Sequence, residues 1–280
     1  MPRASSLAIC LDCGRRLRGL DACPGCGRAY PERDGILAAI GPLEGRNRVA
    51  AAFYDGPGWE RFRPWERMFL RLQGGRARAR RQVLRHLDAP PFARVLEVGI
   101  GDGENLPLLP SDWAVYGVDI ARKRLEECQE GDPRMRGRLA WAEAEALPFG
   151  DAAFDACWTI GGFNYFRDRD AALREMRRVT RPGGTLVVAD ELPTLHRLGI
   201  GHLVGLKGLD RAWMGALGLD PEFIAMVFEG AFDVDRVVRG SWPGARRSSI
   251  WGGLGYCYAD ADTRSSSDSS DKPLGRPFGS

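Results

Sequence analysis

Four cysteines near the N-terminus have the spacing of a metal site. Cys10 and Cys13 form one Cys-x-x-Cys pair, and Cys23 and Cys26 form a second pair nine residues later. Four thiolates in two such pairs suit a closed tetrahedral Zn²⁺ site. Redox dithiols or disulfides are the alternative, which the duplication and a reducing compartment disfavour. Because four cysteines fill the coordination shell, we expect a structural zinc rather than a catalytic one.

A glycine-rich segment further along could bind a nucleotide-like cofactor. Residues 95–98 are predicted to form a buried strand, which leads into Gly99, Gly101 and Gly103. Glycine allows a backbone to approach a ligand closely and to adopt dihedral angles closed to other residues. A second strand ends at Asp119, 20 residues after Gly99, where a carboxylate can accept both hydroxyls of a ribose. These residues alone do not separate NAD from S-adenosylmethionine (SAM).

Short apolar runs alternate with helical segments around these motifs. Buried strands are expected at 94–98, 114–118, 139–142, 156–159 and 185–188, helices at 121–129 and 171–179, and a final pair of strands over 233–258. Such alternation is typical of the doubly wound α/β class. We therefore expect a Rossmann-like, mostly parallel, seven-stranded sheet with helices on both faces.

Composition divides the chain into four parts. With 280 residues and 44% hydrophobic residues, it can hold one large α/β domain and a small appendage. The expected parts are a zinc ribbon at 1–42, a helical linker or lid at 43–90, an α/β domain at 91–260 with a helical substrate-cover insert at about 192–230, and a disordered tail at 261–280. The tail is rich in Ser, Asp, Gly and Pro, so it should carry no chemistry.

Several ordered motifs downstream of the glycines extend this interpretation. They are EAEALPF at 143–149, FD at 154–155, LREM at 173–176 and RPGGTL at 181–186. Together they resemble the class I SAM-dependent methyltransferase family (type 11) that includes the ubiquinone and menaquinone enzymes. The similarity covers about residues 94–191, a third of the chain. It implies a methyltransferase whose acceptor is a small, hydrophobic or aromatic metabolite, either quinone-like or a secondary metabolite.

The resemblance also implies which residues bind SAM. The matching positions are Glu97, Gly99, Gly101, Gly103, Asp119, Ile120, Glu143 and Ala144. Glu97 and the glycines would surround the methionine part, Asp119 would hold the ribose, and Ile120 would flank the adenine. The family usually has Asp where this chain has Glu143, so a surface acid is the alternative there. Ala144 would offer its backbone amide instead.

Candidates for contact with the acceptor follow the fourth and fifth strands, where the pocket of an open α/β sheet lies. They are Asn164, Tyr165, Glu191 and His196, and Tyr54 precedes the core where related enzymes often place a lid helix. Glu191, Tyr165 and His196 are also candidate catalytic residues, although positioning alone supplies much of the rate of such transfers. The plain alternatives are capping and packing for Asn164 and Tyr165, core packing for Tyr54, and an exposed helical position for His196.

Two other functions remain open. Residues 1–90 contain 17 Arg and 9 acidic residues, which gives a net charge of +8 and could attract RNA. A zinc ribbon before a SAM domain resembles the ribosomal RNA guanine-N1 methyltransferases, so an rRNA or tRNA base methyltransferase is one alternative. This chain departs from them at Cys23 and Cys26, where they use a mixed Cys/His pair, and in its loop at 161–164. The other alternative is a non-catalytic protein that kept the SAM fold for binding or regulation.

The end of the cysteine module and the N-terminus carry two further expectations. Residues 30–37 resemble small zinc-ribbon proteins that bind and stabilise methyltransferases, so the module could brace the SAM domain or dock a protein. No apolar run approaches the ~20 residues needed to span a bilayer, and residues 1–17 lack the apolar core of a signal peptide. We therefore expect a cytoplasmic protein without a membrane span.

Overall fold

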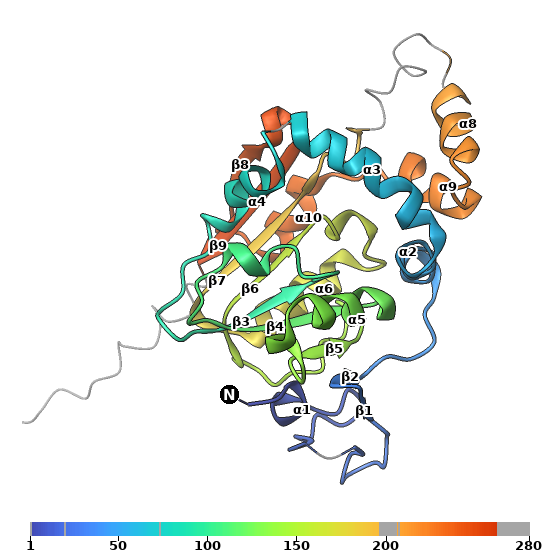
Figure 1. The fold of residues 1–280 in the computed structure, drawn as a ribbon. Coiled ribbons are helices and arrows are strands. Elements are labelled where there is room, and N and C mark those ends of the chain that lie inside the picture. Colours follow the sequence, from blue (N-terminus) through green and yellow to red (C-terminus); the bar gives the residue numbers. More distant parts are fainter. Residues whose placement is uncertain (1, 20, 73, 196–205, 207, 262–280) are drawn as a thin grey trace, which may run out of the picture.

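The computed structural model describes residues 2–19, 21–72, 74–195, 206 and 208–261 (Figure 1). Two of the sequence-based expectations lie outside this part of the chain. One is the candidate catalytic residue His196, and the other is the tail from residue 262 onward.

A nine-stranded sheet forms the centre of the protein, in the order β1-β2-β5-β4-β3-β6-β7-β9-β8. The strands are β1 (Glu32–Arg33), β2 (Ile36–Ala38), β3 (Arg94–Val98), β4 (Ala114–Asp119), β5 (Leu139–Trp141), β6 (Phe154–Ile160), β7 (Thr180–Glu191), β8 (Arg246–Ile250) and β9 (Gly255–Ala261). The strands from β2 to β7 are parallel, and β1, β8 and β9 are antiparallel to their neighbours. The predicted seven-stranded α/β sheet is confirmed as β3 to β9, and two N-terminal strands extend it.

The helices are α1 (Ala4–Leu7), α2 (Gly45–Asp55), α3 (Pro57–Leu72), α4 (Arg76–Leu84), α5 (Arg122–Gly131), α6 (Arg169–Val179), α8 (Gly208–Ala216), α9 (Pro221–Glu229) and α10 (Val234–Ser241). The expectation of strands throughout 233–258 is wrong at its start, because α10 precedes the strand pair. Val234, Val238 and Trp242 are buried four residues apart, which is a helical period, and the Asp233 side chain caps the first turn. Among the described helices, none is long and apolar enough to cross a membrane.

Helices cover both faces of the sheet, as the alternation of side chains along β3 requires. Leu96 packs on one face in a cluster with Leu173 of α6, and Val95 packs on the other face with Val83 of α4 and Leu125 of α5. All five side chains are fully buried. The central strand is therefore apolar on both faces, as expected for a parallel sheet between two helical layers.

The cysteine-bearing N-terminal segment packs directly on the edge of the sheet. Ile36 of β2 pairs with Leu139 of β5 in parallel register, and the Ile9 amide donates to the Pro148 carbonyl at 3.0 Å. Leu17, between the two cysteine pairs, is fully buried in the cluster that contains Phe149. The first 38 residues thus share the hydrophobic core of the α/β domain instead of forming a detached unit.

Helices from two distant parts of the chain lie side by side above the sheet (Figure 1), where α2 packs against α9. The rings of Phe53 and Phe223 stack at 3.6 Å between these two helices. The carboxylate of Asp55, at the end of α2, accepts the backbone amides of Arg122 and Lys123 at 3.2 and 2.9 Å. A carboxylate at the first turn of α5 satisfies amides that have no partner within the helix. Together, α2, α3, α8 and α9 form the part of the structure that we call the cover.

We predict that the N-terminal segment unfolds together with the sheet. Leu37 of β2 is 1% exposed, so Leu37→Ala should lower the free energy of unfolding by about 2–5 kcal/mol. Urea denaturation measures this loss, and hydrogen exchange should show that amides of β3 and β4 lose protection equally. Leu43→Ala, at a partly exposed site before α2, is the control and should cost less than about 1 kcal/mol. Unchanged protection of β3 and β4 in Leu37→Ala would contradict a shared core.

Candidate functional site

A cavity of about 230 Å³ opens at the carboxyl ends of β3, β4, β6 and β7, between the sheet and helices α2 and α3. In the order β5-β4-β3-β6-β7, the strands that directly follow β3 in the chain lie on one side of it, and the later strands β6 and β7 lie on the other side. The strand order therefore reverses at β3. Ligands of open α/β sheets bind at such a switch point. The glycine-rich segment, Asp119 and Glu191 all reach this cavity.

The three predicted glycines have two different roles in the loop after β3. Gly99 and Gly101 line the cavity at φ values of +74° and +56°, and a Cβ on Gly101 would meet no atom within 4 Å. Gly103, at φ +80°, is not part of the wall. A Cβ there would lie 2.7 Å from Leu106 and 2.8 Å from Cys128. The first two glycines therefore bring backbone to a ligand, while Gly103 allows the loop to pack on the helix behind it.

Glu97 lies at the end of β3 with 1% of its surface exposed. The Asn105 side-chain amide donates to Oε1, whereas Oε2 has no hydrogen-bond partner among the described residues. Burial raises the pKa of this carboxyl to about 7. A buried carboxylate oxygen without a partner is costly, and Glu97 lines the cavity. The site is therefore suited to a cationic group such as an ammonium.

Asp119 ends the neighbouring strand β4 and has a well-defined orientation. Its Oδ2 accepts the Gly101 amide at 2.8 Å, and its Oδ1 accepts the Ala121 amide at 2.8 Å. Burial raises the pKa of this carboxyl to about 6. Each carboxylate oxygen can accept a further hydrogen bond, so Asp119 can still receive hydroxyl donors. Ile120 and Ala144, which the sequence analysis names as candidate cofactor-binding residues, also line the cavity.

The structure places Glu143 away from the wall of the cavity. Its carboxylate accepts the Asn47 side-chain amide at 2.8 Å and lies 3.7 Å from the Arg167 guanidinium. Glu145, two residues later, does line the cavity, and it accepts the same Asn47 amide at 3.0 Å. Asn47 of α2 thus joins the cover to the loop after β5, a link that no local pattern in the sequence indicates.

Two tyrosines and a carboxylate form the other end of the cavity. Tyr54, Tyr165 and Glu191 all line it, and the Tyr165 hydroxyl donates to Glu191 Oε1 at 3.3 Å. Burial raises the pKa of Glu191, and burial beside Glu191 raises the pKa of Asp190 to about 8. This end therefore offers a carboxyl that gains a proton more readily than one in water.

Asn164 supports this end from behind rather than facing the cavity. It is 7% exposed, its side-chain amide donates to the Glu191 carbonyl at 2.8 Å, and its Oδ1 accepts the Tyr256 hydroxyl at 2.9 Å. Its backbone amide donates to Asp190 at 2.9 Å. Asn164 lines only a smaller hollow of about 30 Å³ next to the cavity. These bonds hold the loop after β6 against the end of β7.

Helices α3 and α4 contribute polar residues that the sequence did not single out. Arg80 lines the cavity, donates to Asn105 Oδ1 at 3.2 Å and forms an ion pair with Glu104. Glu66 also lines the cavity, and its Oε2 is buried without a partner among the described residues. Arg80 belongs to a run of arginines at 76–85 that resembles a solvated helix face, so no local signal distinguishes it.

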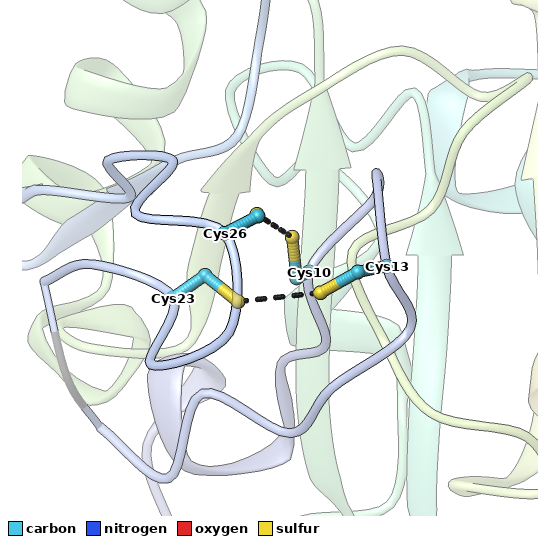
Figure 2. Close-up of side chains that lie close together, drawn as sticks. All are labelled: Cys10, Cys13, Cys23 and Cys26. Atoms are coloured by element: carbon cyan, nitrogen blue, oxygen red, sulfur yellow. Dashed lines mark hydrogen bonds between the residues drawn. The ribbon is translucent and has the colours of Figure 1, made fainter.

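The four N-terminal cysteines converge in the structure (Figure 2). Their sulfur atoms all lie within 4.8 Å of one another, with Cys10 to Cys26 at 3.5 Å and Cys13 to Cys23 at 3.4 Å. A tetrahedral zinc with Zn–S bonds of about 2.3 Å needs sulfur atoms about 3.8 Å apart, so this arrangement fits the ion. The Tyr30 hydroxyl accepts the Leu11 amide at 2.6 Å and donates to Cys10 Sγ at 3.4 Å.

The remaining cysteines belong to the hydrophobic core. Cys128, Cys157 and Cys257 are fully buried, and none of the seven cysteines of the chain forms a disulfide in the structure. Among the described residues, the cysteines that lie close enough together to hold a metal are the four near the N-terminus.

Comparison with known proteins identifies the same segment. Residues 96–188 match the family model described as a methyltransferase domain. The chain is 35% identical over 176 residues to the demethylmenaquinone methyltransferase of Roseiflexus castenholzii, which covers 56% of this chain and 73% of that protein. It is also 34% identical over 120 residues to Methyltransferase GfsG of Streptomyces halstedii, covering 39% of this chain and 41% of that protein.

A further relative has a defined substrate in its name. The chain is 30% identical over 169 residues to the 27-O-demethylrifamycin SV methyltransferase of Amycolatopsis mediterranei, covering 53% of this chain and 59% of that protein. The chain therefore spans 41% and 59% of the lengths of the Streptomyces and Amycolatopsis proteins. The shared part contains the glycine loop, Asp119 and the strands that form the floor of the cavity.

A pair of alanine substitutions should separate the two roles of the glycines. Gly103→Ala must displace Leu106 or Cys128, so it should destabilise the fold by about 1–3 kcal/mol more than Gly101→Ala does. Gly101→Ala is the matched control, because it shares the positive φ but meets open space. Urea unfolding of both variants measures the difference. Equal losses of stability would show that backbone strain alone explains both glycines.

Proposed function

Because this chain belongs to the class I SAM-dependent methyltransferase family, we propose that it transfers the methyl group of SAM to a small, hydrophobic or aromatic metabolite. The observation that carries the proposal is the buried Glu97 carboxyl in the wall of a cavity that Asp119 and the glycine loop also line, with one oxygen that has no hydrogen-bond partner among the described residues. When bound, SAM supplies an electrophilic methyl group on a sulfonium. The residues of the chain hold it, orient the acceptor and exclude water.

In this proposal, the residues along β3 and β4 bind the cofactor. Glu97 Oε2 accepts the ammonium of the methionine part, the backbone at Gly99 and Gly101 passes beside it, and Asp119 accepts the ribose hydroxyls. Ile120 and Ala144 flank the adenine. Gly103 and Glu143 act indirectly, Gly103 by the packing of the loop and Glu143 through its hydrogen bond to Asn47.

We predict that SAM binding depends on pH through Glu97. Its carboxyl must be ionised to hold an ammonium, and its pKa is about 7 because it is buried. Lowering the pH from 8 to 6 protonates it, so the dissociation constant for SAM should rise about tenfold. Isothermal titration calorimetry measures this change and also tests the proposed function, since a chain that binds no SAM at either pH would refute it.

Two variants test whether the pH dependence of SAM binding arises from Glu97. Glu97→Gln should bind SAM more weakly at pH 8 and lose most of the difference between pH 8 and pH 6. Asp119→Asn should also bind SAM more weakly but keep most of that difference. Because the pKa of Asp119 is about 6, its ionised fraction falls only about twofold between pH 8 and pH 6, against about tenfold for Glu97. A Glu97→Gln variant with the wild-type pH response would contradict the assignment.

The proposed acceptor lies under the cover, beside Tyr165 and Glu191. Aromatic side chains from the cover face this part of the cavity, namely Tyr54, Trp59 and Phe62. Broad apolar and aromatic walls favour flat or apolar molecules over strongly polar ones. The names of two relatives support the same class, since one methylates a demethylmenaquinone and the other a demethylrifamycin.

Glu191 is our candidate for accepting a proton from the acceptor, with Tyr165 as its partner. Burial raises the pKa of Glu191, and a carboxylate of higher pKa is a stronger base once it is ionised. The Tyr165 hydroxyl donates to this carboxylate and orients it. Asn164 holds the backbone of the same residue and acts as a positioning residue. The remaining candidate, His196, lies outside the described residues.

We further propose that Cys10, Cys13, Cys23 and Cys26 bind one structural Zn²⁺. The spread of the four sulfur atoms supports this, and the reducing cytoplasm where we place the protein would keep the thiols available. None of these cysteines is among the residues that line the cavity. The zinc would therefore act as a brace, because the free energy of metal binding becomes free energy of folding in a segment with little core of its own.

Removal of the metal should destabilise the whole protein. The purified chain should contain one zinc per molecule by elemental analysis, and Cys13→Ser should lose it. The loss should lower the midpoint of thermal unfolding by at least about 10 °C. Cys257→Ala alters a buried cysteine outside the cluster and is the control that should retain one zinc. A wild-type chain without zinc after growth in zinc-supplemented medium would refute the site.

A further inference from the structure

Large apolar side chains that remain exposed gather on helices α3 and α8. Trp65 and Met68 of α3 are 38% and 49% exposed, and Leu209 and Trp213 of α8 are 51% and 43% exposed. The two indole rings meet edge to face with their centroids 5.0 Å apart, so the two helices present one continuous surface. We call these four residues the tryptophan patch. Apolar side chains that cluster in this way mark interaction sites more often than single exposed ones do.

Arginines lie on both sides of the part of the tryptophan patch that α3 contributes. Residues three and four apart are neighbours on a helix surface, so Arg61 adjoins Trp65, and Arg71 adjoins Met68. Arg67 lies one turn before Arg71, and all three arginines are exposed. The next helix, α4, packs on α3 and carries two further exposed arginines, Arg78 and Arg81.

The acidic groups near the patch are fewer, and the nearest on α3 is already paired. Glu60 lies 3.1 Å from the guanidinium of Arg124 and 3.7 Å from the ammonium of Lys123. Glu66 points to the other face of α3, where it lines the cavity. Asp210 lies in the first turn of α8, the helix that carries Leu209 and Trp213. The surface around the two tryptophans is therefore apolar at its centre and cationic on its α3 side.

We propose that the tryptophan patch docks the protein on an anionic lipid bilayer. Tryptophan side chains favour the headgroup level of a bilayer, aliphatic side chains enter the acyl boundary, and arginines bind anionic headgroups. Single-stranded RNA is a weaker match, because Met68 and Leu209 offer no ring on which a base could stack. The inference goes beyond the proposed function and does not rest on it, since lipid binding needs neither SAM nor an acceptor.

The position of the patch gives such docking a consequence for the cavity. One face of α3 carries Trp65 and Met68, and its other face carries Phe62, Glu66 and Leu70, which line the cavity. A bilayer in contact with the patch therefore lies against the outer surface of the same helix that closes the site. In Figure 1, α3 and α8 lie at the periphery of the molecule, on the opposite side from the N-terminal segment.

Co-sedimentation of the full chain with lipid vesicles tests this proposal. Wild-type protein should bind vesicles of equal parts phosphatidylcholine and phosphatidylglycerol, with binding that weakens as salt rises, and should bind pure phosphatidylcholine much less. Trp65→Ser with Trp213→Ser should lower the partition coefficient at least about tenfold. Arg67→Ser with Arg71→Ser should lower it about fivefold per arginine on the anionic vesicles only.

Matched variants show whether the effect belongs to the patch. Phe92→Ser removes an aromatic side chain that is 75% exposed near the amino end of β3, and Arg174→Ser with Arg236→Ser removes two exposed arginines from α6 and α10. Both controls should bind vesicles as the wild type does, and circular dichroism should show that every variant is folded. Binding that falls equally in the controls would overturn the assignment to the patch.

Three other results would overturn the proposal itself. The first is a folded wild-type chain that does not bind anionic vesicles. The second is a dimer, detected by light scattering, that the double tryptophan variant abolishes, since the patch would then be a subunit interface. The third is binding of single-stranded RNA that depends on the two tryptophans and prevents vesicle binding, which would make the patch a nucleic-acid surface.

Discussion

The burial of the Glu97 carboxyl at the end of the central strand is the constraint on which much of the structure depends. A carboxylate in that position is unfavourable unless polar groups surround it. Asn105 donates to one of its oxygens, and Arg80 donates to Asn105 from behind. Arg80 is in turn paired with Glu104. The loop after β3 and helix α4 are thus fixed relative to each other by the need to accommodate one charge.

The same network fixes the position of the glycine loop. The Asp119 carboxylate, at the end of β4, accepts the Gly101 amide. The Arg63 guanidinium of α3 forms an ion pair with Asp102 Oδ2 at 2.6 Å. The loop is therefore attached to a strand on one side and to the cover on the other. One oxygen of Glu97 has no hydrogen-bond partner among the described residues, so the carboxyl is preorganised for the ammonium that we propose it accepts.

The sequence predicted the strands at the centre of the sheet because these depend on local patterns. The strands around Glu97 and Asp119 are short apolar runs followed by glycine or an acid. In a chain where they alternate with helical segments, such runs indicate buried strands. The pairing of β2 with β5 could not be read in this way, since it joins residues about 100 positions apart. The distinction between Glu143 and Glu145 was equally hidden, because it depends on Asn47 in a distant helix.

The cover is attached to the rest of the protein by other interactions than those that join the strands of the sheet, and this difference bears on the choice of acceptor in the proposed function. Its contacts are mostly between side chains of separate helices, such as the stack of Phe53 on Phe223, and few backbone hydrogen bonds join it to the sheet. Substitutions there can change the shape of the acceptor end while the strands that carry Glu97 and Asp119 stay in place. Several polar links are exceptions. Among them, Asp55 connects α2 to the start of α5, Asn47 connects α2 to the loop after β5, and Arg63 connects α3 to the glycine loop. In the function that we propose, changes that preserve these links leave the cofactor half intact, so acceptor specificity can vary independently of cofactor binding within one fold.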